Sequence, residues 1–262
     1  MLNKNLFLII SVSLILSFTV IIIFSCSTKQ VINVAENGDI SCNVEIKLTR
    51  MFTSYIDDLS EAAGTGEKIE SYFDVNQIKE SFSSLEGISL EKISDSSKPE
   101  LKLSFSVKNN AQGIKSSAAG EIFSFTENNG IKKISFNLDR KNYEKLNKAF
   151  AFDDNPVLAG LTPQVDNPYS EEEYFELVDY VFGEYAASLG SSEQDSGGNP
   201  SAKTLTPGKI ISECFVDVEV NVKGKVMRAD GGKISGSRAN FKIPVIRFLT
   251  LSDPVFLEVE YK

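Results

Sequence analysis

The chain has 262 residues, of which 42% are hydrophobic and 24% charged, and its net charge is −9. The apolar content supports a packed core, and the acidic balance argues against nucleic acid as a partner. The sequence contains no histidine, which removes Ser-His-Asp and Cys-His catalysis and the commonest zinc sites. We therefore expect no cofactor, no metal site and no enzymatic activity.

Residues 1–25 have the layout of a secretory signal peptide. Lys4 is the only charged residue ahead of the apolar run 6–24, as in the basic and hydrophobic regions of such peptides. The run closes with Ile23-Phe24-Ser25-Cys26. This motif resembles the lipobox of bacterial lipoproteins, in which an aliphatic residue and a small residue precede a cysteine whose thiolate forms a thioether with lipid. We predict cleavage between Ser25 and Cys26, lipidation of Cys26, and a lipidated tether over residues 26–30.

An uncleaved anchor helix is the alternative for the same run, because about 19 residues at a rise of about 1.5 Å each span roughly 28 Å, close to the thickness of a bilayer core. We favour the lipoprotein. In both interpretations the remainder of the chain is too rich in charge to enter lipid. We therefore expect a protein of the bacterial cell envelope that is attached to a membrane at its N-terminal end, with the bulk of the chain outside the cytoplasm.

The exported chain is expected to start with a β-hairpin followed by two helices. From residue 40 to 48 every even position is apolar and every odd position is polar, which predicts a strand with one buried face. Asn37-Gly38 is a turn signal, so residues 31–35 are expected to pair back onto that strand. Apolar residues at helical spacing then predict helices over residues 51–59 and 75–85.

Four further strands and a short helix are expected next. The strands are predicted over residues 89–94, 101–107, 120–127 and 131–138, and the helix within residues 139–150. Asn129-Gly130, between the last two strands, is the strongest hairpin signal in the sequence. The predicted fold class is α+β, an antiparallel β-sheet with helices packed on one face.

The segment from residue 143 to 204 is expected to be an insertion of helices and loops. Residues 151–168 predict a packed or lid-like stretch, in which Asp153-Asp154 is either a cation site or, as the following Asn155-Pro156 favours, part of a helix cap. Ser170-Glu171-Glu172-Glu173 is a capping box. The helix that it opens either packs against two partners or lines a lipid pocket, and its acidic polar face disfavours binding to a membrane surface.

After a flexible linker at about residues 190–203, the chain is expected to be entirely β. The strands predicted there cover residues 210–222, 224–228, 233–235, 240–247 and 255–261, with Gly231-Gly232 between the second and the third. We expect these strands to join the first sheet. Residues 31–262 then form a single α+β domain that contains the insertion.

Cys42 and Cys214 are the two cysteines that remain after lipidation. Both fall on the apolar face of an alternating strand, so we expect both to be inaccessible to solvent. In an oxidising envelope they would form a disulfide if they lay on neighbouring strands with Cα atoms about 4.4–6.8 Å apart. Two buried free thiols are the alternative that we favour, because free cysteine is among the most buried residue types.

Two segments resemble the LppM-like family of bacterial envelope lipoproteins. They are Val31-Ile32-Asn33-Val34-Ala35-Glu36-Asn37-Gly38-Asp39, and Gly224-Lys225-Val226-Met227-Arg228-Ala229-Asp230-Gly231-Gly232-Lys233-Ile234-Ser235-Gly236-Ser237 leading into Phe241. The resemblance covers most of residues 31–142 and 205–262 and rests on short turn patterns centred on glycine. It implies a lipid-anchored domain with a lipid- or glycolipid-handling fold. The chain departs from the family pattern in the segment 143–204 and in ending without a C-terminal transmembrane helix.

These patterns predict a membrane-anchored, non-enzymatic lipoprotein that binds an apolar or amphiphilic ligand, such as a lipid or glycolipid, in a cavity between helices and sheet. The 18 Phe and 8 Tyr residues supply apolar walls for such a cavity. An envelope scaffold that binds other proteins is the alternative, with its partners unspecified. A secreted enzyme is a minor alternative, because the sequence has no G-x-S-x-G or H-E-x-x-H motif and no spaced metal ligands.

Overall fold

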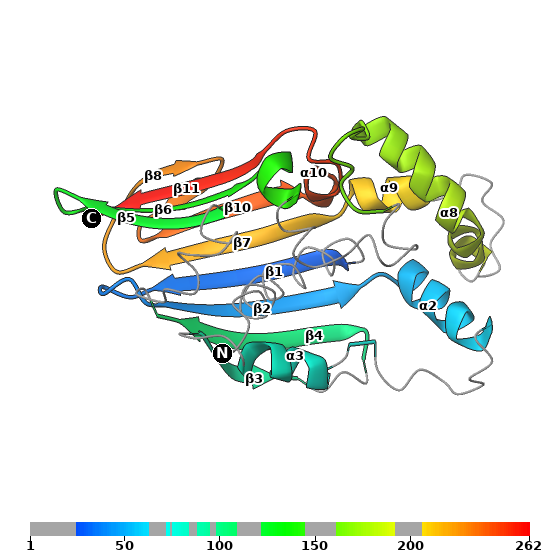
Figure 1. Ribbon diagram of the computed structural model, residues 1–262, viewed down its shortest axis with the longest axis horizontal. Helices are drawn as coiled ribbons and strands as arrows, with labels where there is room; N and C mark the ends of the chain where they lie inside the picture. The colour runs from blue at the N-terminus through cyan, green and yellow to red at the C-terminus, as the bar shows by residue number, and fades with distance from the viewer. Residues whose placement is uncertain are drawn as a thin grey trace, which may run out of the picture.

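The structure is a computed structural model in which two β-sheets form the body of the molecule and most helices gather at one end (Figure 1). It describes residues 25–62, 72–73, 75–83, 88–94, 98–108, 122–144, 161–191 and 206–262. The α+β class predicted from the sequence is confirmed. The strands described form two sheets where the sequence pattern predicts one.

The elements have the following bounds. The strands are β1 (Ser25–Val34), β2 (Ile40–Leu48), β3 (Ile88–Ile93), β4 (Glu100–Val107), β5 (Phe123–Asn128), β6 (Ile131–Leu138), β7 (Phe215–Val222), β8 (Val226–Asp230), β9 (Lys233–Ser235), β10 (Arg238–Pro244) and β11 (Val255–Tyr261). The helices are α2 (Arg50–Ala62), α3 (Val75–Ser83), α8 (Glu171–Ser191), α9 (Pro207–Ser212) and α10 (Val245–Thr250).

β1 lies in the middle of a seven-stranded sheet with the order β3-β4-β2-β1-β7-β10-β9. It pairs antiparallel with β2 and parallel with β7, so that Ile32 stands opposite Cys42 on one side and Val220 on the other. The hairpin predicted between β1 and β2 is confirmed, with Gly38 at a φ of 82° in its turn. The parallel β1–β7 pair departs from the predicted antiparallel sheet, because the long stretch of chain between these strands supplies the crossover that parallel neighbours need.

One face of this sheet is buried and the other is polar, as the alternating patterns predict. In β7 the apolar residues Val216, Val218, Val220 and Val222 are at most 7% exposed. The outer face carries amides and hydroxyls that bond across the strands. Asn221 Nδ2 donates to Asn33 Oδ1 at 3.1 Å, and Ser104 Oγ donates to Asn43 Oδ1 at 2.7 Å.

The second sheet has four strands in the order β5-β6-β11-β8. The predicted Asn129-Gly130 hairpin joins β5 to β6, with φ values of 52° and 74° that fit a two-residue turn. The chain passes between the two sheets at Gly224 (φ 134°), where a Cβ atom would collide with the Lys262 carbonyl, and at Gly231 (φ 81°). Our prediction that the late strands all join the first sheet is therefore wrong, because β11 pairs with β6 and β8 pairs with β11 in the second sheet.

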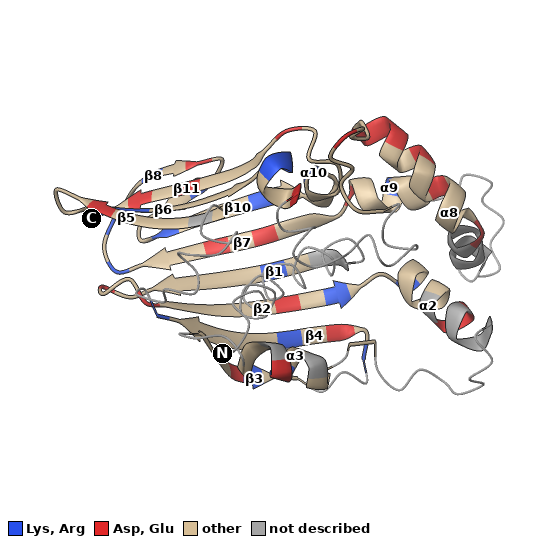
Figure 2. Cartoon of the chain, viewed as in Figure 1, with Lys and Arg blue, Asp and Glu red and all other residues tan. Residues whose placement is uncertain are grey.

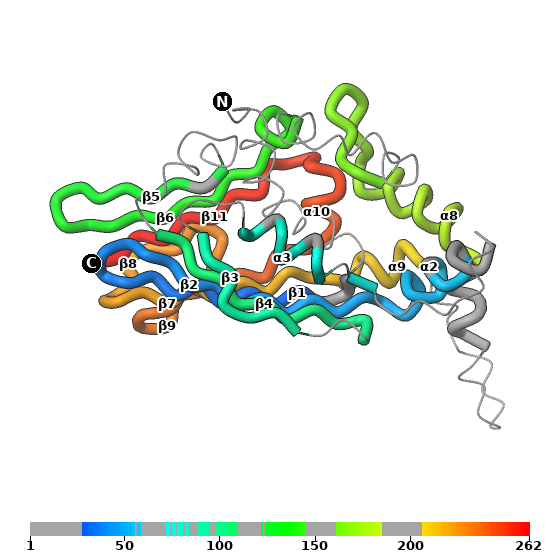
Figure 3. Tube along the Cα trace, turned by 60° about the horizontal axis from the view of Figure 1, so that its bottom comes forward, coloured from blue at the N-terminus to red at the C-terminus, as the bar shows by residue number. Residues whose placement is uncertain are grey.

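Two clusters of apolar side chains bury the inner face of the seven-stranded sheet. In the large core, residues of β7 and β10 pack against the four-stranded sheet and against α8, α9 and α10. In the small core, residues of β2 and β4 pack against α3 and Phe73. Figures 1 and 3 show the four-stranded sheet on the side of β10 and α3 on the side of β4.

The end of the molecule at which β1 starts, together with α2, α8 and α9, is called the helical end. Ser25 pairs with Leu48, and α2 begins two residues after Leu48. Ser27 pairs with Phe215, which follows α9. Pairing with both neighbours therefore brings the first residues of β1 between α2 and α9, and α8 lies beside both helices at this end (Figures 1 and 3).

Three local predictions differ from the structure. Residues 26–30, predicted as a tether, belong to β1, because β2 and β7 offer hydrogen-bond partners on both sides and Thr28 is fully buried. A strand was expected from residue 210, but residues 207–212 form α9. A strand was also expected to run through residue 247, but β10 ends at Pro244 and α10 follows, since the chain must turn there to reach the four-stranded sheet.

Several predictions fall outside the described residues. They concern residues 1–24 of the signal peptide, Asp153-Asp154 with Asn155-Pro156, and all but the first part of the linker at 190–203. The predicted helix within residues 139–150 is described as far as residue 144, and it is helical from Arg140. The division into one domain with an insertion at 143–204 stays a prediction.

Candidate apolar site at the helical end

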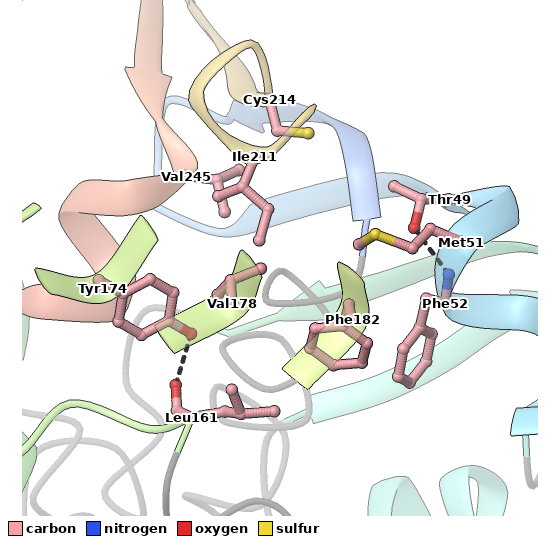
Figure 4. Close-up of a pocket in the computed structure, with 10 residues that line it drawn as sticks. All are labelled: Thr49, Met51, Phe52, Leu161, Tyr174, Val178, Phe182, Ile211, Cys214 and Val245. Carbon is pink, nitrogen blue, oxygen red and sulfur yellow. Dashed lines mark hydrogen bonds between the residues drawn. The ribbon is translucent and has the colours of Figure 1, made fainter. Parts of the chain in front are cut away.

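A small apolar cavity lies where α2, α8 and α9 meet (Figure 4). Its lining comes from the start of α2, the segment before α8, α8 itself, α9 with the link to β7, and the start of α10. The lining residues are Thr49, Met51, Phe52, Leu161, Tyr174, Val178, Phe182, Ile211, Cys214 and Val245. None of these side chains carries a charge at neutral pH in its ordinary form.

α8 presents Tyr174, Val178 and Phe182 to the cavity at a spacing of four residues, and all three are at most 3% exposed. The predicted capping box fixes the first turn of this helix. The Glu173 N–H donates to Ser170 Oγ at 3.2 Å, and the Ser170 N–H donates to Glu173 Oε2 at 2.8 Å. The helix packs against α2 and α9, as the first of the two alternatives predicts, and it also lines the cavity. A lipid in that cavity stays a prediction.

α9 is held against α8 by one short hydrogen bond. The Gly208 N–H donates to Asp179 Oδ1 at 2.6 Å. A Cβ atom at position 208 would lie 2.9 Å from Phe175 Cβ, so this approach requires glycine. Thr206 caps α9 by accepting from the Lys209 N–H at 3.3 Å. These contacts fix the wall that carries Ile211.

The α2 side of the cavity is closed by aromatic contacts. The rings of Tyr55 and Phe182 meet edge to face, with centroids 5.1 Å apart. Thr49 Oγ1 accepts from the Phe52 N–H at 3.2 Å and so caps the first turn of α2. Ring contacts of this kind are less directional than the hydrogen bond that holds α9 to α8.

The polar groups on the cavity wall already have partners within the protein. The Tyr174 hydroxyl donates to the Leu161 carbonyl at 2.8 Å, and the Cys214 thiol donates to the Ile210 carbonyl at 3.1 Å. Burial raises the pKa of Tyr174 far above its usual range, and the nearby Tyr143 and Tyr169 add to this effect. Tyr174 is therefore a neutral phenol, and the site favours apolar groups over ions.

The cavity is small. Its volume is about 20 Å³, which holds little more than one water molecule, since a single water needs roughly 10–15 Å³ by the same measure. The described residues contain no group of three or more side chains able to hold a metal ion, and none of the described helices is long and apolar enough to cross a bilayer.

The two internal cysteines are both buried thiols outside any disulfide, with exposures of 6% for Cys42 and 1% for Cys214. The strand register explains why they do not meet. Cys42 stands across β1 from Val220, whereas Cys214 precedes Val220 by six residues on the chain, about 20 Å along the strand direction. A disulfide requires Cα atoms within about 7 Å, so the disulfide alternative is excluded and the alternative with two buried thiols describes the structure.

The backbone at Cys26 lies beside the cavity. β1 steps from Ser25, opposite Leu48, to Ser27, opposite Lys47, so Cys26 is the extra residue of a β-bulge. On the other side the pairing with β7 starts at Ser27 and Phe215. Thr49 follows Leu48 and Cys214 precedes Phe215, and both line the cavity. The predicted lipidation site and the cavity thus share one end of the fold.

The cavity could not be found from the sequence because distant segments build it. One signal for it was missed. Thr206-Pro207 is a helix N-cap followed by proline at the first helical position, a pattern that predicts α9. The strict alternation of the valines after Cys214 favours a strand, and it led the predicted strand to start too early.

Comparison with known proteins gives a likeness to a solved structure. No family model matches this chain, and no curated protein matches it. The chain is similar to the solved NMR structure of the folded domain of the Mycobacterium tuberculosis LppM protein, with 9% sequence identity over 90% of this chain and 88% of that chain, at a TM-score of 0.33. Membership of the LppM-like family stays a prediction from the residues.

Proposed function

We propose that this chain is a membrane-anchored lipoprotein of the bacterial envelope, without enzymatic activity, that binds one acyl chain of an amphiphilic lipid or glycolipid at the helical end. The observation that carries the proposal is the coincidence of two features. The residue that the lipobox-like motif marks for lipidation lies at the end of the sheet where the uncharged cavity opens between helices. Apolar pockets with few, fixed polar groups suit such ligands.

Binding of an acyl chain requires the cavity to widen from its present volume. We propose that the α2–α8 wall opens, because the edge-to-face contact between Tyr55 and Phe182 is less directional than a hydrogen bond. The α8–α9 wall is held by the Gly208–Asp179 hydrogen bond and stays in place. The ligand would thus enter by displacing α2. Burial of its methylenes, at about 0.8 kcal/mol each, would offset the cost of separating α2 from α8.

The anchoring part of the proposal is tested by metabolic labelling with a fatty-acid analogue. Wild-type protein is expected to incorporate the label, and Cys26→Ser is expected to lose it and either leave the membrane or remain as the unprocessed precursor. Cys42→Ser is the matched control, because it removes a buried cysteine elsewhere and leaves the motif intact. Equal labelling of wild type and Cys26→Ser would contradict the assignment.

The ligand part is tested by mass spectrometry of the tag-free, full-length protein purified in detergent. A stoichiometric co-purified lipid is expected. Val178→Phe fills the cavity and is expected to reduce the bound lipid at least tenfold, whereas Glu176→Phe adds the same ring at an exposed position of α8 and keeps it. Absence of lipid from wild type would favour the scaffold alternative, in which the protein binds other proteins of the envelope.

The non-enzymatic part is tested by a broad screen for hydrolytic and redox activity on the same protein. We expect no turnover above background. Reproducible turnover that a single Asp, Glu or Ser substitution removes would replace the binding proposal with the enzyme alternative.

A further inference from the structure

We infer that the helical end of the molecule rests on the membrane surface, so that the apolar cavity faces the bilayer to which the chain is anchored. This inference deepens the proposed function, because it rests on membrane attachment at the N-terminal side of β1. The partner is the lipid bilayer itself. The interacting surface consists of the start of β1 with α2 and α9, and from α8 only Tyr180 is proposed to reach the headgroup region, since the acids of that helix disfavour a membrane surface (Figure 1).

The first argument is the absence of a spacer between anchor and fold. Ser27 is already paired with Lys47 on β2 and with Phe215 on β7. A lipid on Cys26 is thus one residue, or roughly 3–4 Å, from backbone that is hydrogen-bonded on both sides. The same holds for an uncleaved anchor helix, because the apolar run 6–24 ends one residue before β1 begins.

The second argument is the direction of the strands. β1 and β7 run away from the helical end and β2 runs toward it. The opposite end carries the turns of both hairpins, which lie together because Lys132 Nζ donates to the Glu36 carbonyl at 2.6 Å. β7 has eight residues, and at about 3.3 Å per residue the sheet alone places these turns roughly 25 Å from the anchored end.

The third argument concerns the side chains at the helical end. Among the large hydrophobic side chains that the structure describes, Tyr180 on α8 is the most exposed, at 89%. Tyrosine is enriched where proteins meet the headgroup region, because its ring is apolar and its hydroxyl is polar. The acids of α8, which begin with Glu171, Glu172 and Glu173 at its first turn, repel anionic headgroups (Figure 2). Zwitterionic lipid is therefore the appropriate surface for a test.

The test compares the two ends of the acylated, full-length protein in phosphatidylcholine vesicles that contain a nitroxide-headgroup lipid. One variant carries a fluorophore at Arg50→Cys on α2 and the other at Asn128→Cys beside the far hairpin turn. Both positions are exposed, and the native Cys42 and Cys214 are buried. Quenching by the nitroxide lipid is expected to be at least five-fold stronger at position 50 than at position 128.

The result that overturns the inference is equal quenching at the two positions, or stronger quenching at position 128. Flotation of the protein with the vesicles reports anchoring separately. Protein that does not float contradicts the proposed anchoring, and protein that floats but is quenched equally contradicts the orientation alone.

A third variant carries about 20 Gly and Ser residues between Cys26 and Ser27, a spacer with an average reach of roughly 25 Å. It is expected to float as before and to lose most of the quenching at position 50. Unchanged quenching would show that the short anchor does not set the orientation.

Discussion

The inner face of the seven-stranded sheet is covered in two different ways. β7 and β10 face the four-stranded sheet in the large core, whereas β2 and β4 face α3 and Phe73 in the small core. The alternation of apolar residues is equally strict in β2 and β7. The alternating pattern of a strand thus determines which of its faces is buried, and distant segments of the chain determine what covers that face.

The difference predicts that the two halves of the sheet differ in stability. α3 has nine residues, a length at which an isolated helix is not stable in water. It stays folded through contacts such as the one between the rings of Phe82 and Phe105, whose centroids are 5.5 Å apart. The four-stranded sheet has its own hydrogen-bond ladder and does not depend on single side chains in this way. The small core is therefore expected to open first.

The largest expected effect comes from removing one phenylalanine ring from each core. Phe241→Ala, in β10, is expected to lower the free energy of unfolding by about 3–5 kcal/mol, because the ring is 2% exposed and packs against Gly232. Phe82→Ala is expected to release α3. It should increase amide hydrogen exchange at least tenfold in β3 and β4 while leaving β7 and β10 protected. Urea denaturation and hydrogen exchange measure the two effects.

Ile243→Val is the control for the first comparison, since it removes one methylene from β10 and is expected to cost about 1 kcal/mol. If Phe82→Ala lowered the protection of β7 and β10 as much as that of β3 and β4, the two cores would unfold as one unit and the comparison would fail.

The two buried thiols provide a reporter in each core. Burial raises the pKa of Cys42 to about 12, so the native thiol is protonated and unreactive at pH 8. Neither cysteine is expected to react in the native protein. In urea below the unfolding transition, Cys42 in the small core is expected to react at least tenfold faster than Cys214 in the large core, as measured by mass spectrometry. The single variants Cys42→Ala and Cys214→Ala assign the signals, and faster reaction of Cys214 would reverse the predicted order.

A smaller effect is expected at the start of α8. Ser170→Ala removes the cap that accepts from the Glu173 N–H and is expected to cost about 1 kcal/mol of stability. Because α8 packs on the large core, the variant is expected to speed the reaction of Cys214 and to leave that of Cys42 unchanged. Ser170→Asp keeps a capping oxygen and serves as the control. A change at Cys42 alone would show that α8 supports the other core.

The smallest effect is a pH dependence on the outer face over the small core. A hydrogen bond from Lys47, with Lys102 nearby, lowers the pKa of Glu45 below its ordinary value of 4.5. The folded-state pKa is lower than the unfolded one, so this stabilisation is present above about pH 4.5 and is lost as the pH falls through the folded value. The group is on the surface, so we expect a few tenths of a kcal/mol. Glu45→Gln is expected to flatten the acid limb of a stability–pH curve by this amount, and an unchanged limb would contradict the assignment.

Local patterns predicted the parts of the fold that local chemistry decides. The alternation around Cys42 and Val218 indicated the buried faces of β2 and β7, and the turn at Asn129-Gly130 and the capping box at Ser170 have the predicted geometry. Each of these signals depends on residues within a few positions of one another, so the sequence displays them directly.

The remaining features depend on contacts between distant segments. The split into two sheets follows from where the chain crosses at Gly224 and Gly231, and a glycine signals a turn without saying which sheet the next strand joins. The predicted first strand begins at residue 31, whereas β1 begins at Ser25. Thr28 and Gln30 are polar and so break the apolar pattern, although both lie on the same face as Ile32 and Thr28 is fully buried. The cavity could not be predicted because its walls depend on how α2 and α8 pack.

The parallel pairing of β1 with β7 also limits when the protein is able to fold. The paired residues of the two strands, such as Ser27 and Phe215, are separated by about 190 residues in the sequence. Contacts between residues so distant in sequence form slowly. During synthesis from the N-terminal end, β1 emerges long before β7, so the middle of the sheet stays incomplete until most of the chain has followed. Until then the unpaired edge of the β1–β2 hairpin is exposed to other strands. A chaperone that binds extended segments would protect the nascent chain at β1, and the need for it would end once β7 had emerged.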